Sequence, residues 1–301
     1  MGGFCKTEQY ENDKCSEKKF NLRIVFAACF VLITIFFVCF GLSPALQAVS
    51  PAPDGAYSGA NTAEGGSGTL FSLTTGTNNT ALGSQALFSL TTGSQNTATG
   101  VQALKSNTAN RNTADGFQAL VRNTTASDNT ATGWRALFQN TIGDTNTAVG
   151  SQALYSNTTG IDNTGTGFKA LYSNTTGGGN TAMGQIALSS NTTGINNTAI
   201  GFNSLGGGTT GSNNTGIGTG AGAFVFGDNN TVTGSGALGG GGANNTADGS
   251  NALGQNNGDD NTTIGANALG QLGFFGGPGG GNTALGSGAA LLSPRAITTS
   301  T

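Results

Sequence analysis

The pattern of apolar and polar positions repeats about fourteen times between residues 61 and 290. Each copy reads Asn-Thr-Ala-x-Gly-x-x-Ala-Leu and is followed by a link rich in Ser, Asn, Thr and Gly. The opening Asn stands at positions 61, 79, 96, 112, 129, 146, 163, 180, 197, 214, 230, 245, 261 and 282, so the middle copies are almost all seventeen residues apart. A fixed short period predicts the stacked coils of a solenoid rather than a globular core.

The pattern inside one copy predicts which side chains face inward. In residues 146–160 the first positions alternate as in a short β-strand, and Gly150 permits a turn after them. The third position of the motif is almost always Ala, which indicates a crowded inner column. The fourth position varies from Asp115 to Ile200, which indicates an exposed column. The Leu that ends each motif is equally regular and predicts the apolar spine of the array.

The segment around the Leu column fits two kinds of secondary structure. Trp134, Leu137 and Phe138 have the i, i+3, i+4 spacing of a helical turn. One turn of helix in each coil is therefore one prediction, and a second strand is the alternative. Periodicity over so few residues leaves both open.

The links carry turn residues and predict contacts between coils. Asn-Thr-Thr-Gly recurs at 157–160, 174–177 and 191–194, and Asn and Gly tolerate left-handed backbone conformations. If the coils stack in register, the Asn columns are expected to form amide ladders along the array. Burying one Leu contributes roughly 1.5–3 kcal/mol, whereas ordering the backbone costs about 1–2 kcal/mol per residue. A single coil therefore cannot fold alone, and the copies must stack.

Composition and charge narrow the function classes. The chain has 53 Gly, 36% hydrophobic and 8% charged residues, a balance also found in disordered chains, but a disordered tract has no reason to keep a strict period. The net charge is −3 and the few Lys and Arg are scattered, so no basic stripe supports a nucleic-acid partner. The chain has no His, which excludes His-based catalytic triads and His metal ligands.

The N-terminal residues differ from the repeats. Residues 1–23 are a charged tail, and residues 24–42 are an uncharged apolar run, typical of a signal-peptide h-region or a transmembrane anchor. A cleaved signal and a retained anchor are equally open, and both predict repeats that are secreted or exposed at the cell surface. Residues 43–60 are expected to be a linker or N-terminal cap, 61–290 the repeat solenoid, and 291–301 a C-terminal tail.

No pattern predicts a catalytic, cofactor-binding or metal site. All four Cys lie within the first 39 residues, so the exported part cannot use disulfides and must gain its stability from stacking. The Gly-rich stretches at 206–208 and 239–242 lack the Lys of a phosphate-binding loop. Residues 256–261 offer oxygen ligands that suit Ca²⁺, but the Asp that a repeating calcium site requires is present in only some copies. We expect no enzyme activity, no cofactor and no metal.

The Thr column and the aromatic residues suggest contact surfaces. A Thr follows every opening Asn, which would suit an ice-binding solenoid if the column were flat and outward, although Thr also suits strands and its hydroxyl can bond a neighbouring turn. The aromatic residues concentrate in the middle copies, where they could fill the interior, line a seam between chains or form an outer stripe. We expect the interior or the seam for Phe117, Trp134, Phe138, Tyr155, Phe168, Tyr172 and Phe202.

Residues 146–150 (Asn-Thr-Ala-Val-Gly) and 197–201 (Asn-Thr-Ala-Ile-Gly) are the copies closest to a known repeat. The motif resembles the Asn-Ser-x-Ala-Ile-Gly repeats in the heads of YadA-like trimeric autotransporter adhesins, whose repeats are shorter. The nine-residue motif is also similar to repeats of large bacterial surface proteins that end in a self-cleaving chaperone domain. The nine residues after Leu292 contain no heptad stalk, β-barrel segment or chaperone domain, so we expect an N-terminal anchor, a freely secreted protein or a truncated reading frame.

The resemblance implies a left-handed parallel β-roll, a homotrimer and adhesion to a host or extracellular-matrix ligand. The expected fold is therefore all-β: a parallel β-solenoid of about fourteen seventeen-residue coils, preceded by an N-terminal membrane or signal helix. The expected function is that of an exported bacterial cell-surface module that makes multivalent structural or adhesive contacts and touches the membrane only through residues 24–42. The alternative is a ligand- or ice-binding solenoid that uses the Thr column.

Overall fold

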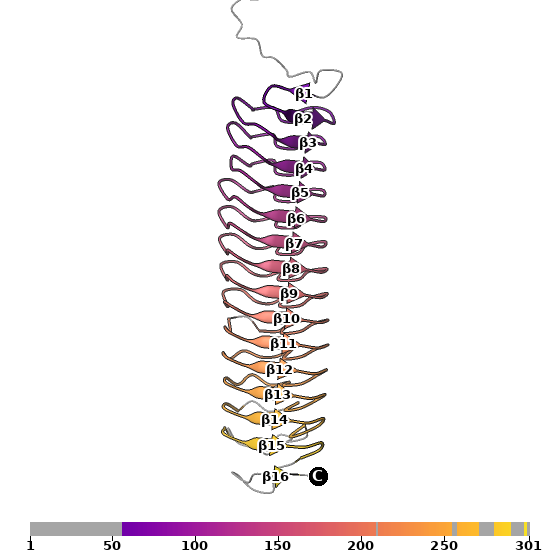
Figure 1. Ribbon diagram of the computed structural model, residues 1–301, viewed down its shortest axis with the longest axis vertical. Helices are drawn as coiled ribbons and strands as arrows, with labels where there is room; N and C mark the ends of the chain where they lie inside the picture. The colour runs from indigo at the N-terminus through magenta and orange to yellow at the C-terminus, as the bar shows by residue number, and fades with distance from the viewer. Residues whose placement is uncertain (1–55, 209, 255–257, 271–279, 290–297, 300–301) are drawn as a thin grey trace, which may run out of the picture. The chain divides into compact units, whose positions relative to one another are not determined.

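The computed structural model describes residues 56–208, 210–254, 258–270, 280–289 and 298–299. Within these ranges every regular element is a β-strand, and the strands form one sheet in chain order (Figure 1). The strands are β1 (Ala56–Tyr57), β2 (Asn61–Glu64), β3 (Thr80–Leu82), β4 (Thr97–Thr99), β5 (Thr113–Asp115), β6 (Thr130–Thr132), β7 (Thr147–Val149), β8 (Thr164–Thr166), β9 (Thr181–Met183), β10 (Thr198–Ile200), β11 (Thr215–Ile217), β12 (Thr231–Thr233), β13 (Thr246–Asp248), β14 (Thr262–Ile264), β15 (Thr283–Leu285) and β16 (Thr298–Thr299). The prediction of an all-β parallel solenoid is confirmed.

Each copy of the motif supplies one short strand, which pairs with its equivalent in the next coil. Between β7 and β8, for example, Thr147 pairs with Thr164 and Val149 with Thr166. The parallel pairing continues from β2 to β16 (Figure 1), and from β2 to β15 the motif Thr of each strand pairs with the motif Thr of the next. The exception is β1, which runs antiparallel to β2 and covers its free edge. Such a cover prevents an exposed strand edge from pairing with another chain.

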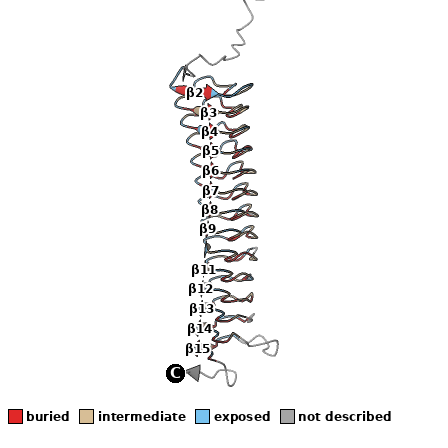
Figure 2. Ribbon diagram, turned by 90° about the vertical axis from the view of Figure 1, so that its right-hand side faces the viewer, coloured by how far each residue is buried: buried red, intermediate tan, exposed pale blue. Residues whose placement is uncertain are grey.

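The inner columns are those that the sequence predicted. The third-position Ala and the motif's Ala-Leu pair are buried in coil after coil, and together they form one continuous apolar core (Figure 2). The third position suits a small residue: at Gly165, which replaces Ala there, an added Cβ would make an ordinary contact of 3.4 Å with a side-chain atom of Leu154, and Val232 and Thr263 are also buried at this position. The fourth position faces outward, as expected.

The predicted one-turn helix in each coil is wrong, and so is the alternative of a second strand. The segment after each strand is a series of tight turns, in which Ala153 N donates to Gly150 O and Asn157 N to Leu154 O. Gln152 and Leu154 have φ angles of 58° and 51°, a left-handed conformation that an α-helix cannot contain. The peptide N–H of Leu154 instead donates to Ala170 O in the next coil. Bonds between coils therefore replace the bonds that a helix would make within one.

Gly150 shows why the motif contains an obligatory Gly. Its φ is 136°, and a Cβ built there would lie 2.6 Å from the carbonyl oxygen of Gly167, its counterpart in the next coil. Only Gly combines this φ with such a close approach of two backbones. The same geometry recurs at the equivalent Gly of most coils.

The predicted amide ladders are present, and there are two of them. In the first, the opening Asn ladder, Asn163 receives both the backbone and the side-chain N–H of Asn180 at its Oδ1, at 3.1 and 3.0 Å. Its own Nδ2 donates to Asn146 Oδ1 and Gly177 O. The members of this ladder are buried from Asn61 to Asn282.

The second Asn ladder is shorter and occupies the third position after the Leu column. From Asn123 onward, each Nδ2 donates to the Oδ1 of the preceding coil and to the carbonyl three residues ahead, as Asn157 does to Asn140 and Gly160 at 2.8 and 2.9 Å. Its members are Asn107, Asn123, Asn140, Asn157, Asn174 and Asn191. All six are buried. Each amide of this ladder donates both of its side-chain protons to protein acceptors, and each Oδ1 from Asn107 to Asn174 accepts a bond from the next Asn of the ladder, as a dry interior requires of polar groups.

The predicted N-terminal membrane or signal helix, residues 24–42, lies outside the described residues. Among the residues that are described, no helix has the length and apolar character to span a membrane.

Candidate interaction surfaces

The outer face of the sheet carries the Thr column. These Thr side chains are exposed or half-buried, so the column faces outward. Within the described part of the chain, their hydroxyls form no hydrogen bond to protein, so the expectation that they satisfy neighbouring turns is not met. Four strands, β4, β6, β8 and β12, also carry Thr at the fourth position. They are separated by other strands, so the paired Thr columns are interrupted.

The fourth-position column is apolar in the middle of the array. Val149, Met183, Ile200 and Ile217 are 39–48% exposed on β7, β9, β10 and β11. Asp115 and Asp248 occupy the same column nearer the two ends. The column is therefore mostly apolar from β7 to β11, where Thr166 on β8 interrupts it, and mixed toward the ends, where Ile264 and Leu285 are also exposed.

The expectation that the aromatic residues fill the interior is wrong. Phe117, Trp134, Phe168 and Phe202 directly follow the motif Gly and are exposed. Phe138, Tyr155 and Tyr172 directly follow the Leu column and are half-buried. The reason is positional: Ala and Leu occupy the inner positions of this turn, so the residue after Gly and the residue after Leu point outward. A seam between chains stays a prediction.

Phe138, Tyr155 and Tyr172 form a stack that follows the long axis of the array. Their ring centroids are 5.1 and 5.2 Å apart, and the planes are inclined by 3° and 13°. Because each ring covers the face of the next, the stack leaves ring edges toward solvent. Ring edges carry the positive part of the aromatic quadrupole.

Three cations border this stack. The guanidinium of Arg135 lies 4.6 Å from the ring centroid of Trp134 and 5.1 Å from that of Phe138, and Arg122 lies 5.4 Å from Phe138. Lys169 Nζ lies 5.1 Å from the ring of Tyr172. We call the surface formed by Arg122, Arg135, Phe138, Tyr155, Lys169 and Tyr172 the basic aromatic edge.

The sequence analysis missed the basic aromatic edge because it searched for cations that are adjacent along the chain. Arg122, Arg135 and Lys169 are 13 and 34 residues apart but come together because they all lie in the turn that follows a strand. The available signal was their position relative to the Gly and Leu columns. These cations form no ion pair with any described residue.

In the same coils Asp115 lies at the end of β5, and the other acidic residues lie at the start of the strands, before the opening Asn. Asp128, Asp144 and Asp162 are there, and each accepts a hydrogen bond from the coil before it. Arg111 forms a two-point ion pair with Asp128, with Nε–Oδ1 and Nη2–Oδ2 distances of 2.6 and 2.7 Å. The hydrogen bonds from Arg111 lower the pKa of Asp128, and the same contacts raise the pKa of Arg111. Asp128, Asp144 and Asp162 are thus separated by the length of a strand from the cations of the basic aromatic edge.

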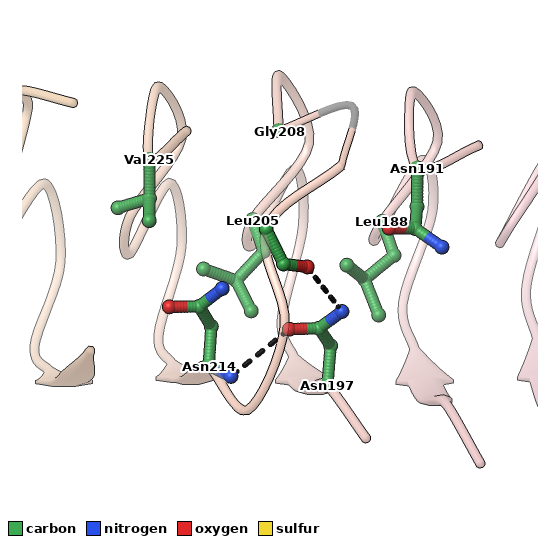
Figure 3. Close-up of a pocket in the computed structure, with 8 residues that line it drawn as sticks. Leu188, Asn191, Asn197, Leu205, Gly208, Asn214 and Val225 are labelled. Carbon is green, nitrogen blue, oxygen red and sulfur yellow. Dashed lines mark hydrogen bonds between the residues drawn. The ribbon is translucent and has the colours of Figure 1, made fainter. Parts of the chain in front are cut away.

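A cavity lies where the second Asn ladder ends (Figure 3). The residue one coil beyond Asn191 is Gly208 and the next is Val225, so no side-chain amide continues the ladder. Among the described residues no donor reaches Oδ1 of Asn191, although this side chain is buried. The cavity is small, with a volume of about 10 Å³, and is lined in addition by Leu188 and Leu205. Its polar part has room for on the order of one water molecule.

Neither the cavity nor the surfaces bring together catalytic groups. Among the described residues, no three His, Cys, Asp or Glu side chains are close enough to hold a metal ion. Asp259 and Asp260, from the segment that could suit Ca²⁺, accept hydrogen bonds from Ala243 N and Asn244 Nδ2. Asn256 and Asn257 of that segment lie outside the described residues. Comparisons of the chain with protein-family models, curated proteins and solved structures find no match.

Proposed function

We propose that this protein is an exported structural and adhesive module of a cell surface, without catalytic activity, that makes multivalent contacts along its array. The observation that carries the proposal is the in-register stacking of the outward columns. Equivalent positions lie in line on successive coils, so a column that keeps one residue type, such as the Thr column, offers a ligand the same group again on each coil. Weak contacts that repeat along a rigid array add up to strong attachment without a deep pocket.

Export and anchoring rest on the sequence. The charged residues 1–23 and the apolar residues 24–42 are those of a signal peptide or signal anchor. The solenoid suits an exposed location because its stability does not depend on disulfides or a metal: its core is apolar and its buried amides bond one another. The likeness of residues 146–150 and 197–201 to adhesin-head repeats supports the same assignment.

The export and adhesion parts of the proposal are tested separately. Antibody against the repeats should label intact cells of the source organism, and external protease should remove that label. Beads coated with the full-length protein should then attach to surfaces that beads coated with an unrelated protein leave bare. Labelling that requires permeabilised cells would contradict export, and equal attachment of both kinds of bead would contradict adhesion.

We extend the proposal to a homotrimer that is held together through the apolar part of the sheet face. Val149, Met183, Ile200 and Ile217 form a row of exposed apolar side chains, of the kind that marks contact with another chain. Light scattering should give three times the chain mass for the native protein, and Met183→Asp with Ile200→Asp should reduce it to one. A monomeric native protein would contradict this arrangement.

A second candidate function, a ligand- or ice-binding solenoid, is favoured by the Thr column. Its hydroxyls face outward and have no protein partners among the described residues, so they are available to water or to a ligand. Thermal hysteresis of the purified protein is the test. Hysteresis that disappears in Thr130→Lys with Thr164→Lys would support ice binding, and its absence from the native protein would exclude it.

A further inference from the structure

We propose that the basic aromatic edge binds a linear acidic polysaccharide that carries carboxylates, such as a polyuronate. The inference deepens the proposed adhesive function by naming the class of ligand and the surface that binds it, and it rests on that function.

The cations of the basic aromatic edge differ from Arg111 in having no carboxylate partner among the described residues. Arg111, at the start of a strand, is paired with Asp128, whereas Arg122, Arg135 and Lys169 have no carboxylate among the described residues. They are instead held over ring faces, which fixes their positions without neutralising them. Arg135 is further held by the bond from its Nε to Gln118 Oε1 at 2.8 Å. Positioned cations without an internal counter-charge favour an anionic partner from outside.

The basic aromatic edge is a narrow strip along the array. The three cations follow the axis of the array across four consecutive coils, a length on the order of 15 Å at the spacing of neighbouring strands. Between them lie the edges of the Phe138, Tyr155 and Tyr172 rings, which are also electropositive. A narrow straight strip suits an extended polymer lying along the array, and it offers little to a compact ligand or to a broad lipid surface.

The positive charges of the basic aromatic edge are widely spaced. Duplex DNA presents about one negative charge per 1.7 Å of axis. Three cations over four coils are far too sparse to match it, but they suit a polymer with one carboxylate per sugar. The polar side chains beside the cations supply hydrogen bonds for sugar hydroxyls, since Gln102 and Gln118 extend the column of Arg135 toward the N-terminus. The basic aromatic edge therefore has cations for the carboxylates, Gln side chains for the sugar hydroxyls, and a straight shape for a linear polymer.

The test uses the full-length protein in mild detergent and three substitutions that the fold already accepts. Arg122→Gln, Arg135→Gln and Lys169→Gln each place Gln in a column where another coil has it, at Gln139, Gln118 and Gln152. Binding of polygalacturonate is measured by calorimetry, with dextran as the neutral polymer. The control is Arg111→Gln, which removes a cation from the other end of the strand.

We expect polygalacturonate to bind, dextran not to bind, and added salt to weaken the binding. The triple variant should lose on the order of tenfold in affinity, because it removes three exposed charge contacts that each contribute modestly to binding. Tyr155→Ser, which interrupts the ring stack and restores the residue found at Ser189, should weaken binding further, and Arg111→Gln should leave it unchanged. Circular dichroism confirms that each variant is folded.

Any of three results would overturn the proposal: no binding of polygalacturonate, equal binding by the triple variant and the native protein, or equally tight binding of duplex DNA or anionic lipid vesicles. Surface labelling and bead attachment are separate measurements. If those succeed while polyuronate binding fails, the adhesive function stands and its ligand lies on another face. If polyuronate binds but the repeats are not exposed on cells, the site stands and the adhesive function fails.

Discussion

The coils that follow β4 to β9 and those that follow β10 to β14 have the same strand and the same opening Asn ladder, but they differ in the second ladder. The first group carries buried Asn from Asn107 to Asn191 at that position, and the second group begins with Gly208 and Val225. Where the ladder stops there is a cavity, and no donor among the described residues reaches Oδ1 of Asn191, the last amide of the ladder. The comparison shows that the strand, the opening Asn ladder and the apolar core suffice for stacking, whereas the second ladder is an addition to them.

The two ends of the second ladder also differ. At its N-terminal end, Asn107 donates to Asn96 Oδ1 and to Ala109 O, so the first member is joined to the opening Asn ladder. In the coil before it, Leu90 fills the same position within the apolar core. At the other end, Asn191 faces the cavity. The first amide of a ladder therefore keeps its hydrogen bonds when a neighbouring ladder accepts its protons. The last amide leaves its Oδ1 without a donor when a small residue follows in the next coil.

The largest effect is expected from Asn163→Ala, which interrupts the opening Asn ladder. Asn180 would lose the acceptor for its backbone and side-chain N–H, and Gly177 O would lose its donor. Buried groups without partners cost about 1–3 kcal/mol each, so we expect a loss of about 4 kcal/mol in the free energy of unfolding. Urea unfolding followed by circular dichroism measures it. A loss below 1 kcal/mol would show that the ladder is not dry.

A loss of about 3 kcal/mol is expected for Gly150→Ala, because the new Cβ would collide with Gly167 O and force Ala into a conformation that suits Gly. Gly220→Asn is the matched control: Gly220 is also left-handed, but a Cβ there meets nothing within 4 Å. Other coils carry Gln or Asn at that position, so the control should change stability little. Equal losses for the two variants would refute the close backbone contact.

Asn157→Ala tests the second ladder and should cost about 2 kcal/mol, since it removes the bonds to Asn140, Gly160 and Asn174. Asn157→Leu should cost less than the Ala variant because Leu90 shows that this position also accepts an apolar side chain. The same urea measurement distinguishes them. A larger loss for Leu than for Ala would mean that this position has no room for an apolar side chain in the middle coils.

A small gain, about 0.5 kcal/mol, is expected for Gln152→Asn. Gln152 has a φ of 58°, and Asn adopts the left-handed conformation more readily than Gln does. The equivalent Asn203 and Asn251 show that the position accepts Asn. A higher urea midpoint is the expected result. A lower midpoint would show that the Gln side chain contributes more than its backbone conformation costs.

The smallest effect concerns pH. The folded pKa of Asp128 is lowered by Arg111, so the pair contributes stability above the ordinary pKa of Asp, and this contribution is lost as the pH falls through the lowered pKa. Both side chains are exposed, so the change in global stability should be slight. NMR titration of the Asp128 carboxyl should show a lowered midpoint that returns to the ordinary value in Arg111→Gln. An unchanged midpoint in that variant would contradict the ion pair.

Much of the fold followed from the sequence, because each column obeys one dominant constraint. The uniform Ala column meant crowding, the Leu column meant an apolar spine, and recurring Asn meant an amide ladder. The turn after each strand was predicted wrongly, since the spacing of Trp134, Leu137 and Phe138 fits a helix as well as a left-handed turn. Only the bonds between coils decide between them, and those depend on stacking that no short window contains.

The candidate site was less accessible to sequence reasoning. The aromatic residues were expected inside because apolar side chains usually are, but the interior is already filled by Ala, Leu and Asn. Once the turn is known, the residue after Gly and the residue after Leu must face solvent, which places Trp134 and Tyr155 outside. The grouping of Arg122, Arg135 and Lys169 follows from the same geometry and was invisible in the linear order of charges.

The most direct test of this account is hydrogen exchange of the Asn side-chain amides, followed by NMR. The ladders predict that the amide protons of Asn157 and Asn163 exchange slowly, because both are bonded inside the array. Asn196 and Asn213 form only solvent-exposed side-chain bonds, so their amide protons should exchange much faster than those of the buried ladders. Free-amide rates for Asn157 and Asn163 would contradict the buried ladders.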